Sequence, residues 1–267
     1  MSYLTDIRTL IYKEKIVMSR YPVRILANTF FPIFFVLIFT FTSLLFVDPS
    51  NSQEISQLSG RMFAGVVIYV FLNSGSDLSQ SIIDEQQQGT IESLYLAPVS
   101  KYLNVVAIIL IRFAFVLLTL VPYYYFMVNI LGKFELHNLG LATLFLICAI
   151  FQIAAFGIFF AGFTLRAKEL APRLAFFITF LIMIFAGIFV PFEALGNRMI
   201  IISYLLPFSY SMDGFSAALL DTKPFFMRLQ LELGINIILS ILTMILSTKF
   251  FLKVEKSLRI DGKLMDY

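Results

Sequence analysis

The sequence predicts an all-α polytopic membrane protein with six transmembrane helices, and three observations support this prediction. Of the 267 residues, 59% are hydrophobic and only 14% are charged, whereas a soluble domain usually carries about 25% charged residues. The mean hydropathy is +0.88. The apolar residues also gather into segments of about 20 residues, which is the length that a helix needs to cross the hydrocarbon core of a bilayer.

Six such segments follow one another in a single transmembrane domain over residues 1–267. They run over residues 25–47, 62–83, 103–131, 139–165, 174–190 and 231–252. If the N-terminus is cytoplasmic, most of the 20 Lys and Arg residues lie on the cytoplasmic side. Because cytoplasmic loops are enriched in Lys and Arg, we expect both termini to be cytoplasmic, with residues 253–267 as a cytoplasmic tail.

Residues 1–22 are predicted to form an amphipathic helix in the membrane interface. Apolar residues recur there at helical spacing, whereas Arg8, Lys13 and Lys15 project mainly from the rest of the helix. A basic face beside an apolar face suits contact with the anionic headgroups of membrane lipids. Pro22 then breaks the helix before the first span.

The loop between the second and third spans, residues 84–100, is acidic where a cytoplasmic loop is usually basic. Gly89 can end the preceding helix, and Thr90 is a favourable N-cap for a new one. Glu92 then lies near the positive end of that helix, which is favourable. Since Pro98 stops the helix after about two turns, the loop is predicted to present a short, capped helix to the cytoplasm.

This short helix carries an apolar face formed by Ile91, Leu94 and Tyr95, which a groove on a partner protein can receive. The loop resembles that of permeases of type-2 ATP-binding-cassette exporters, whose form is E-x-x-x-G-T-[LI]-E-x-L-x-x-x-P-[VL]-S. In that family the loop is the coupling helix that contacts the ATPase subunit. The positions that this resemblance assigns to ATPase coupling are Asp84, Glu85, Gly89, Thr90, Ile91, Glu92, Leu94, Tyr95 and Pro98.

A second resemblance lies between the fifth and sixth spans, in residues 190–222, which we call the outer segment. The segment is apolar but interrupted by Gly and Pro, and broken helices at membrane depth are tolerated where protein or a cavity surrounds them. It is similar to the family's N-P-[LF]-[TS]-Y-x-x-D-like stretch, with Leu206 where the family often has Asn, and this implies short re-entrant helices in the outer leaflet. The residues that carry the resemblance are Pro191, Glu193, Pro207, Tyr210 and Asp213.

The sequence contains no G-x-x-x-x-G-K-[ST] run, so the chain has no phosphate-binding loop of its own. We therefore expect it to bind no cofactor and to carry no catalytic residue. The resemblance implies that ATP and Mg bind to a separate soluble ABC ATPase, present in two copies. It also implies a second permease, expected to form a homodimer, in the plasma (inner) membrane of a prokaryote.

Asp77 and Arg112 are ionisable residues inside the second and third predicted spans. Asp77 and Arg112 lie roughly 9 Å and 13 Å from the cytoplasmic ends of the second and third spans, at 1.5 Å per residue. Because a charge buried in the membrane is costly unless it is paired, we expect these residues to form an ion pair or to line a wet cytoplasmic vestibule. Contact with a charged substrate headgroup is the functional alternative.

The predicted substrate is hydrophobic or amphipathic, such as a drug, a lipid or a peptide. Type-2 exporters of polysaccharides often begin with an R-Y-x-x-S-x-L-G-x-x-W-like stretch, of which this chain keeps Arg20 and Tyr21 but not the Ser, Gly or Trp. The chain contains no Trp at all. A permease for polysaccharides or lipid-linked glycans is the alternative.

Other classes of membrane protein fit the sequence less well. A membrane-embedded lipid-modifying enzyme needs clustered His, Asp or Glu for metal or acid–base chemistry, but the chain has one His, His137, and its acidic residues are expected to cluster only in residues 84–100. The sequence thus predicts no metal site, and the charge of +3 gives no reason to expect nucleic-acid binding. A secondary transporter usually shows internal repeats, and none is evident. A subunit of an ABC complex that does not itself conduct substrate is a further alternative, which the sequence does not separate from an exporter.

Overall fold

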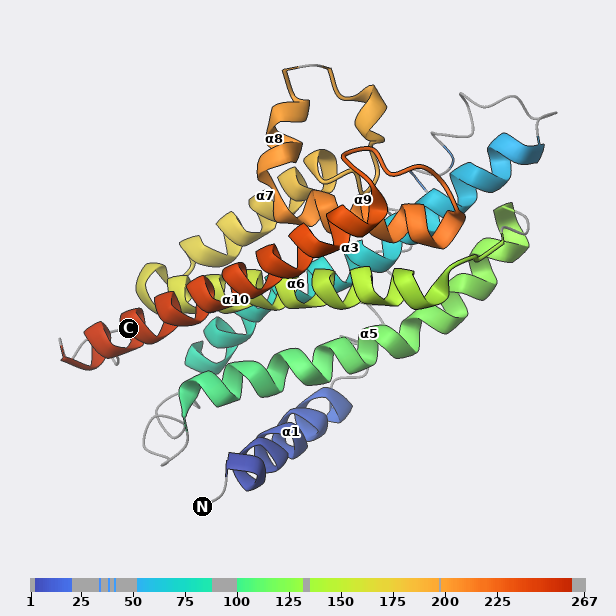
Figure 1. Cartoon of the computed structure of the whole chain (residues 1–267). Coiled ribbons are helices and arrows are strands. Elements are labelled where there is room, and N and C mark those ends of the chain that lie inside the picture. Colours follow the sequence, from blue (N-terminus) through green and yellow to red (C-terminus); the bar gives the residue numbers. More distant parts are fainter. Residues whose placement is uncertain are drawn as a thin grey trace.

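The computed structural model describes residues 3–20, 34, 38, 41, 52–87, 100–131, 135–196 and 198–260, and within these residues the prediction of an all-helical chain is confirmed. The long helices run alongside one another, α1 lies beside α5, and α8 and α9 lie together on one side (Figure 1). In chain order the elements are α1 (Tyr3–Arg20), α3 (Ser52–Gln87), α5 (Lys101–Leu131), α6 (Leu139–Ala167), α7 (Leu170–Phe185), the 3₁₀ helix η1 (Phe192–Ala194), α8 (Ile200–Leu205), α9 (Pro207–Leu220) and α10 (Leu229–Ile260).

Four helices of the described part are long and apolar enough to cross a membrane. Their apolar segments are Ser56–Glu85, Lys101–Tyr125, Leu139–Ala167 and Leu229–Leu258. They correspond to the second, third, fourth and sixth predicted spans. The first predicted span, residues 25–47, lies outside the described residues apart from three single positions, so the count of six stays a prediction.

The fifth predicted span differs from the helix that the structure contains. Helix α7 begins at Leu170 and ends at Phe185, five residues before the predicted end at Val190. Gly187 adopts a φ of 74°, a left-handed conformation that favours glycine and turns the chain out of the helix. With 16 residues, α7 is roughly 24 Å long and shorter than the hydrocarbon core of a bilayer, so residues after Gly187 would have to complete any crossing.

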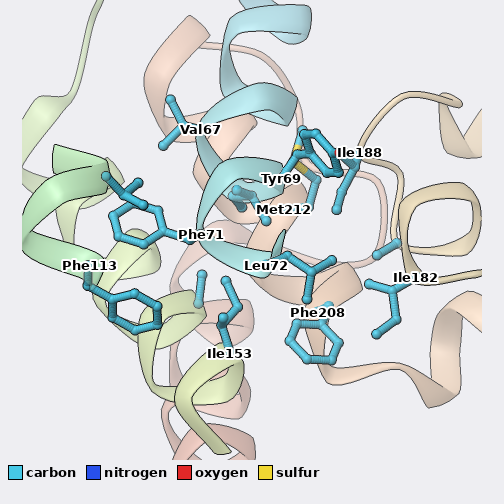
Figure 2. Close-up of a cluster of buried hydrophobic side chains, with 14 of the residues drawn as sticks. Val67, Tyr69, Phe71, Leu72, Phe113, Ile153, Ile182, Ile188, Phe208 and Met212 are labelled. Carbon is cyan, nitrogen blue, oxygen red and sulfur yellow. The ribbon is translucent and has the colours of Figure 1, made fainter. Parts of the chain in front are cut away.

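Helix α3 lies at the centre of the bundle and packs against α5, α6, α7 and α9. Its apolar side chains meet those of the surrounding helices in one continuous core, and Figure 2 shows the middle of this core. The residues labelled there are Val67, Tyr69, Phe71 and Leu72 of α3, Phe113 of α5, Ile153 of α6, Ile182 of α7, Ile188 after α7, and Phe208 and Met212 of α9.

Glycines allow α3 to approach its neighbours closely. A Cβ atom on Gly75 would lie 2.7 Å from the side chain of Ile153, and one on Gly157 of α6 would lie 2.9 Å from the carbonyl oxygen of Gly75. A Cβ atom on Gly65 would lie 2.1 Å from the carbonyl oxygen of Ile188. Because helices in membranes associate largely through close packing of small residues, these contacts fix the position of α3.

We predict that Gly65→Ala destabilises the protein, because the added methyl group meets backbone that cannot move aside. The expected loss in the free energy of unfolding is about 1–3 kcal/mol. Gly234→Ala in α10 is the matched control, since nothing lies within 4 Å of a Cβ atom there, and a gain of up to about 1 kcal/mol is expected from the better helix propensity of alanine. Thermal unfolding of the full chain in detergent measures both, and a Gly65→Ala variant as stable as the wild type would contradict the packing described.

Candidate functional site

The end of α3 that leads into the loop is bound to α1 through an ion pair. The Nζ atom of Lys13 donates a hydrogen bond to Oε1 of Glu85 at 2.6 Å and lies 3.4 Å from Oε1 of Glu14. The side chains of Glu14 and Glu85 are only 13% and 15% exposed, so water screens the attraction less than at an open surface. Glu85 is the first residue of the coupling motif, and the structure thus links that motif to the N-terminal helix.

Burial and charge act in opposite directions on these groups. Burial alone would lower the pKa of Lys13, but Glu85 and Glu14 together outweigh burial and raise the pKa. The pKa of Glu14 is raised, first by burial and then by Glu85, while Lys13 and Arg112 act against the rise. The attraction between the ammonium group and two carboxylates therefore holds Lys13 charged at neutral pH.

Arg112 of α5 reaches the face of α3 that carries Asp77. Its guanidinium group donates to the carbonyl oxygen of Ser74 at 3.5 Å and to the hydroxyl group of Ser81. Ser74, Asp77 and Ser81 stand at i, i+3 and i+7 and so share one side of α3. The structure brings the two predicted intramembrane charges to the same contact between helices, and a direct ion pair between them stays a prediction.

Together these residues form what we call the α1–α3–α5 cluster, which consists of Lys13, Glu14, Ser81, Glu85 and Arg112. Arg112 connects its parts, because it hydrogen-bonds to α3 and acts electrostatically on Glu14 of α1. Sequence analysis did not identify Lys13 as the partner of Glu85. The basic stripe of the N-terminal helix was visible, but no sequence pattern told which of its residues faces α3.

The remainder of the coupling motif is only partly described. Asp84 accepts a hydrogen bond from Gln80 at 3.0 Å within the last turns of α3, and α5 begins at Lys101 directly after Ser100. The motif residues outside the described part are Gly89, Thr90, Ile91, Glu92, Leu94, Tyr95 and Pro98. The short helix predicted for them therefore stays a prediction.

The outer segment folds into η1, α8 and α9, and its predicted residues have different roles. Pro191 precedes η1, and Pro207 is the first residue of α9, where its missing N–H group costs nothing. Glu193 lies 3.5 Å from Arg61 of α3. Tyr210 donates through its hydroxyl group to the carbonyl oxygen of Tyr204 at 3.0 Å.

Asp213 is the predicted residue of this segment that lies deepest, with 6% of its surface exposed. Its Oδ2 atom accepts the backbone N–H groups of Phe225 and Phe226 at 2.6 Å and 3.0 Å. Burial raises the pKa of Asp213 above its ordinary value, although the two N–H groups and the charge of Arg61 act against the rise. Asp213 thereby fastens the hairpin of residues 221–228, which connects α9 to α10.

The acidic residues were expected to cluster only in residues 84–100, and this expectation is wrong. Glu232 in the first turn of α10 is completely buried, and its carboxyl group lies within hydrogen-bonding reach of Asp213. The two residues are 19 positions apart, and the pair forms only because the hairpin returns the chain across α9. Among the described residues, no group of three His, Cys, Asp or Glu side chains is placed to hold a metal ion.

A buried polar network continues from this pair between α6, α9 and α10. Gln152 of α6 donates through Nε2 to Oδ1 of Asn236 at 2.7 Å and to Oγ of Ser240 at 3.1 Å. Ser211 of α9 lies 2.9 Å from both Gln152 Oε1 and Asn236 Oδ1. Sequence analysis missed these residues too, although the i, i+4, i+8 spacing of Glu232, Asn236 and Ser240 in an apolar span places them on one face of a helix.

Comparison with protein families gives a match over most of the chain. A family model described as "ABC-2 family transporter protein" matches residues 47–252, which is most of the chain. The matched range contains α3 to α9 and most of α10, as well as the loop of residues 84–100. A comparison with curated proteins found no match.

We predict that Lys13 and Glu85 are energetically coupled. In a double-mutant cycle of Lys13→Met and Glu85→Gln, measured by thermal unfolding of the full chain, we expect a coupling energy of about 1 kcal/mol, which is modest because Lys13 is partly exposed. The control cycle pairs Glu85→Gln with Lys15→Met, because Lys15 is an exposed residue of the same helix. Additive effects in the first cycle would contradict the contact.

Proposed function

The chain belongs to the ABC-2 transporter family, and we propose that it is the permease subunit of an exporter that a separate ATPase drives. Membership of this family supports the role of a membrane subunit in an ABC transporter. The direction of transport, the coupling role of the loop and the class of substrate go beyond the family and belong to our proposal.

The observation that carries the proposal is the position of the coupling motif on the fold. Residues 84–100 connect α3, the central helix of the described bundle, to α5. The motif begins at Glu85, which Lys13 binds at 2.6 Å. A protein that grips the loop therefore acts on three helices at once, α1 through the ion pair and α3 and α5 through the chain.

In the proposed mechanism, closure of the ATPase subunits around nucleotide displaces the loop. Helix α3 passes the displacement to α5, α6, α7 and α9, against which it packs. Since close-packed helices shift between discrete arrangements rather than deform continuously, the nucleotide changes the balance between two states of the membrane domain. The chain supplies the moving body, and ATP and Mg bind on the partner.

The proposed working unit contains two copies of this chain and two soluble ATPase subunits in the plasma (inner) membrane of a prokaryote, with both termini of each chain cytoplasmic. Exposed apolar side chains on α5 and α10 support a partner surface or contact with lipid. They include Leu118, Val121 and Tyr125 of α5 and Leu231, Ile238 and Ile241 of α10, all more than half exposed.

These apolar surfaces also support a hydrophobic or amphipathic substrate, such as a drug, a lipid or a peptide. A path at the interface between two permeases would be lined by such surfaces, and an apolar surface offers few hydrogen-bonding groups to a sugar chain. A permease for lipid-linked glycans is the second candidate, because the chain keeps the Arg20–Tyr21 pair of that branch.

The coupling role is tested by co-expressing this chain with a soluble phosphate-loop ATPase from the same genome and measuring whether the two co-purify. We expect Glu92→Lys and Leu94→Asp to abolish co-purification, because one variant reverses a charge on the loop and the other places a charge on its apolar face. Glu193→Lys is the control, since this exposed carboxylate belongs to the outer segment.

Thermal unfolding of each variant separates a lost contact from a lost fold. Variants that unfold at the wild-type temperature but no longer retain the ATPase support the proposal. An intact complex of the Glu92→Lys, Leu94→Asp double variant, with its ATP hydrolysis still stimulated by the permease, would exclude these residues as the coupling element.

A further inference from the structure

We propose that Asp213 and Glu232 form a proton-binding site that holds the hairpin of residues 221–228 against the first turn of α10. Figure 1 shows α10 starting beside α9, the helix that carries Asp213. Neither membership of the family nor the proposed coupling mechanism assigns a role to this pair. The two carboxyl groups meet different sets of hydrogen-bond donors.

Asp213 has donors suited to a negative charge. Two backbone N–H groups point at one of its oxygen atoms, at 2.6 Å and 3.0 Å. Arg61 of α3 lies near enough to attract the charge as well. A carboxylate that accepts two N–H groups is stabilised in its ionised form, so Asp213 carries the negative charge of the pair.

Glu232 has no such donors, although it is 0% exposed. Neither of its carboxyl oxygens meets a hydrogen-bond donor among the described residues, while the carboxyl group of Asp213 lies within hydrogen-bonding reach. Two ionised carboxylates in such a contact would repel each other in a medium that screens charge poorly. The contact becomes favourable when Glu232 carries a proton and donates it to Asp213.

The buried polar atoms next to the pair on α10 provide a second, independent observation that this site can hold a polar ligand. Asn236, one turn after Glu232 on α10, is 0% exposed, and its Nδ2 group has no acceptor among the described residues. A buried amide without an acceptor costs free energy unless its position serves another purpose.

The charged and titratable groups around the pair come from several elements. The charge of Arg61 of α3 attracts Asp213, and Arg61 also pairs with Glu193 of η1. Tyr210 of α9 lies close enough to Glu232 to interact with it electrostatically. On α6, the neutral and buried Gln152 bonds to Asn236, one turn after Glu232. At the far end of α9, the exposed His137 bonds to Leu219 through its backbone.

The shared proton stabilises the packing of the hairpin against α10. The hairpin is held by Asp213 and by aromatic contacts of Phe226 with Tyr204 and Tyr210, whose ring centroids lie 5.0 Å away in both cases. When hydroxide takes the proton and becomes water, the O–H bond of Glu232 breaks and two like charges face each other beneath the hairpin. The folded protein thus holds a proton that the unfolded chain releases, so stability falls as pH rises.

The test is the pH dependence of thermal unfolding of the full chain in lipid nanodiscs, between about pH 6 and 9. We expect the unfolding temperature of the wild type to fall by roughly 3–5 °C per pH unit through the range in which the folded protein holds one proton more than the unfolded chain. Glu232→Gln, whose amide can donate to Asp213 without a proton, should remove this slope and unfold at a higher temperature at alkaline pH.

Two matched controls should keep the wild-type slope. Glu169→Gln removes a carboxylate that is 71% exposed at the start of α7, and His137→Gln removes the chain's one histidine. An unchanged slope in Glu232→Gln would overturn the proposal, as would a wild type with no slope. If added Na⁺ or Ca²⁺ at fixed pH stabilises the wild type but not Glu232→Gln, the ligand is a metal cation and the proton assignment is wrong.

Infrared difference spectroscopy of the folded wild type provides a readout that does not depend on stability. We expect the carbonyl stretch of a protonated carboxyl group at neutral pH, and its disappearance when the pH is raised. The band should be absent from Glu232→Gln and present in Glu169→Gln. A folded Glu232→Gln protein that keeps the band would assign the proton to another residue and overturn the proposal.

Discussion

The close approach of α3 to its neighbours is the constraint on which the rest of the structure depends. The glycine at position 157 brings α6 so near to α3 that a single methyl group there would meet the backbone of Gly75. Gly65 produces the same closeness to the chain after α7. Because the bilayer offers no hydrophobic driving force between helices, such close packing makes α3 a rigid axis that four other helices share.

This axis connects the two polar sites of the described structure. Glu85 lies at the end of α3 that contacts α1 and leads into the loop. Arg61 lies roughly 36 Å away along the same helix. Arg61 pairs with Glu193 and attracts Asp213. In the proposed mechanism, a displacement of the loop would reach the residues that hold the outer segment through this one helix.

Sequence reasoning succeeded where a local pattern determines the outcome. Of the six spans that apolar length predicted, four correspond to helices of the described part that are long enough to cross a membrane. It failed where tertiary structure decides: the turn at Gly187 shortened α7, and the pairing of Asp213 with Glu232 requires a hairpin that brings distant residues together. The partner of Glu85 was hidden for the same reason, since several basic residues of the N-terminal helix were equally suited to it by sequence.

The central claim is that the loop after α3 faces the cytoplasm and is held by a motor protein, and labelling of a single cysteine tests it most directly. Cys148 is the chain's one cysteine, so Cys148→Ala provides a background for Leu94→Cys, with Lys223→Cys in the hairpin as the control for the other side. A membrane-impermeant thiol reagent should label position 94 in inverted vesicles but not in intact cells, and the bound ATPase should block the labelling. Labelling of position 94 from outside the cell, or labelling unaffected by the ATPase, would contradict the account.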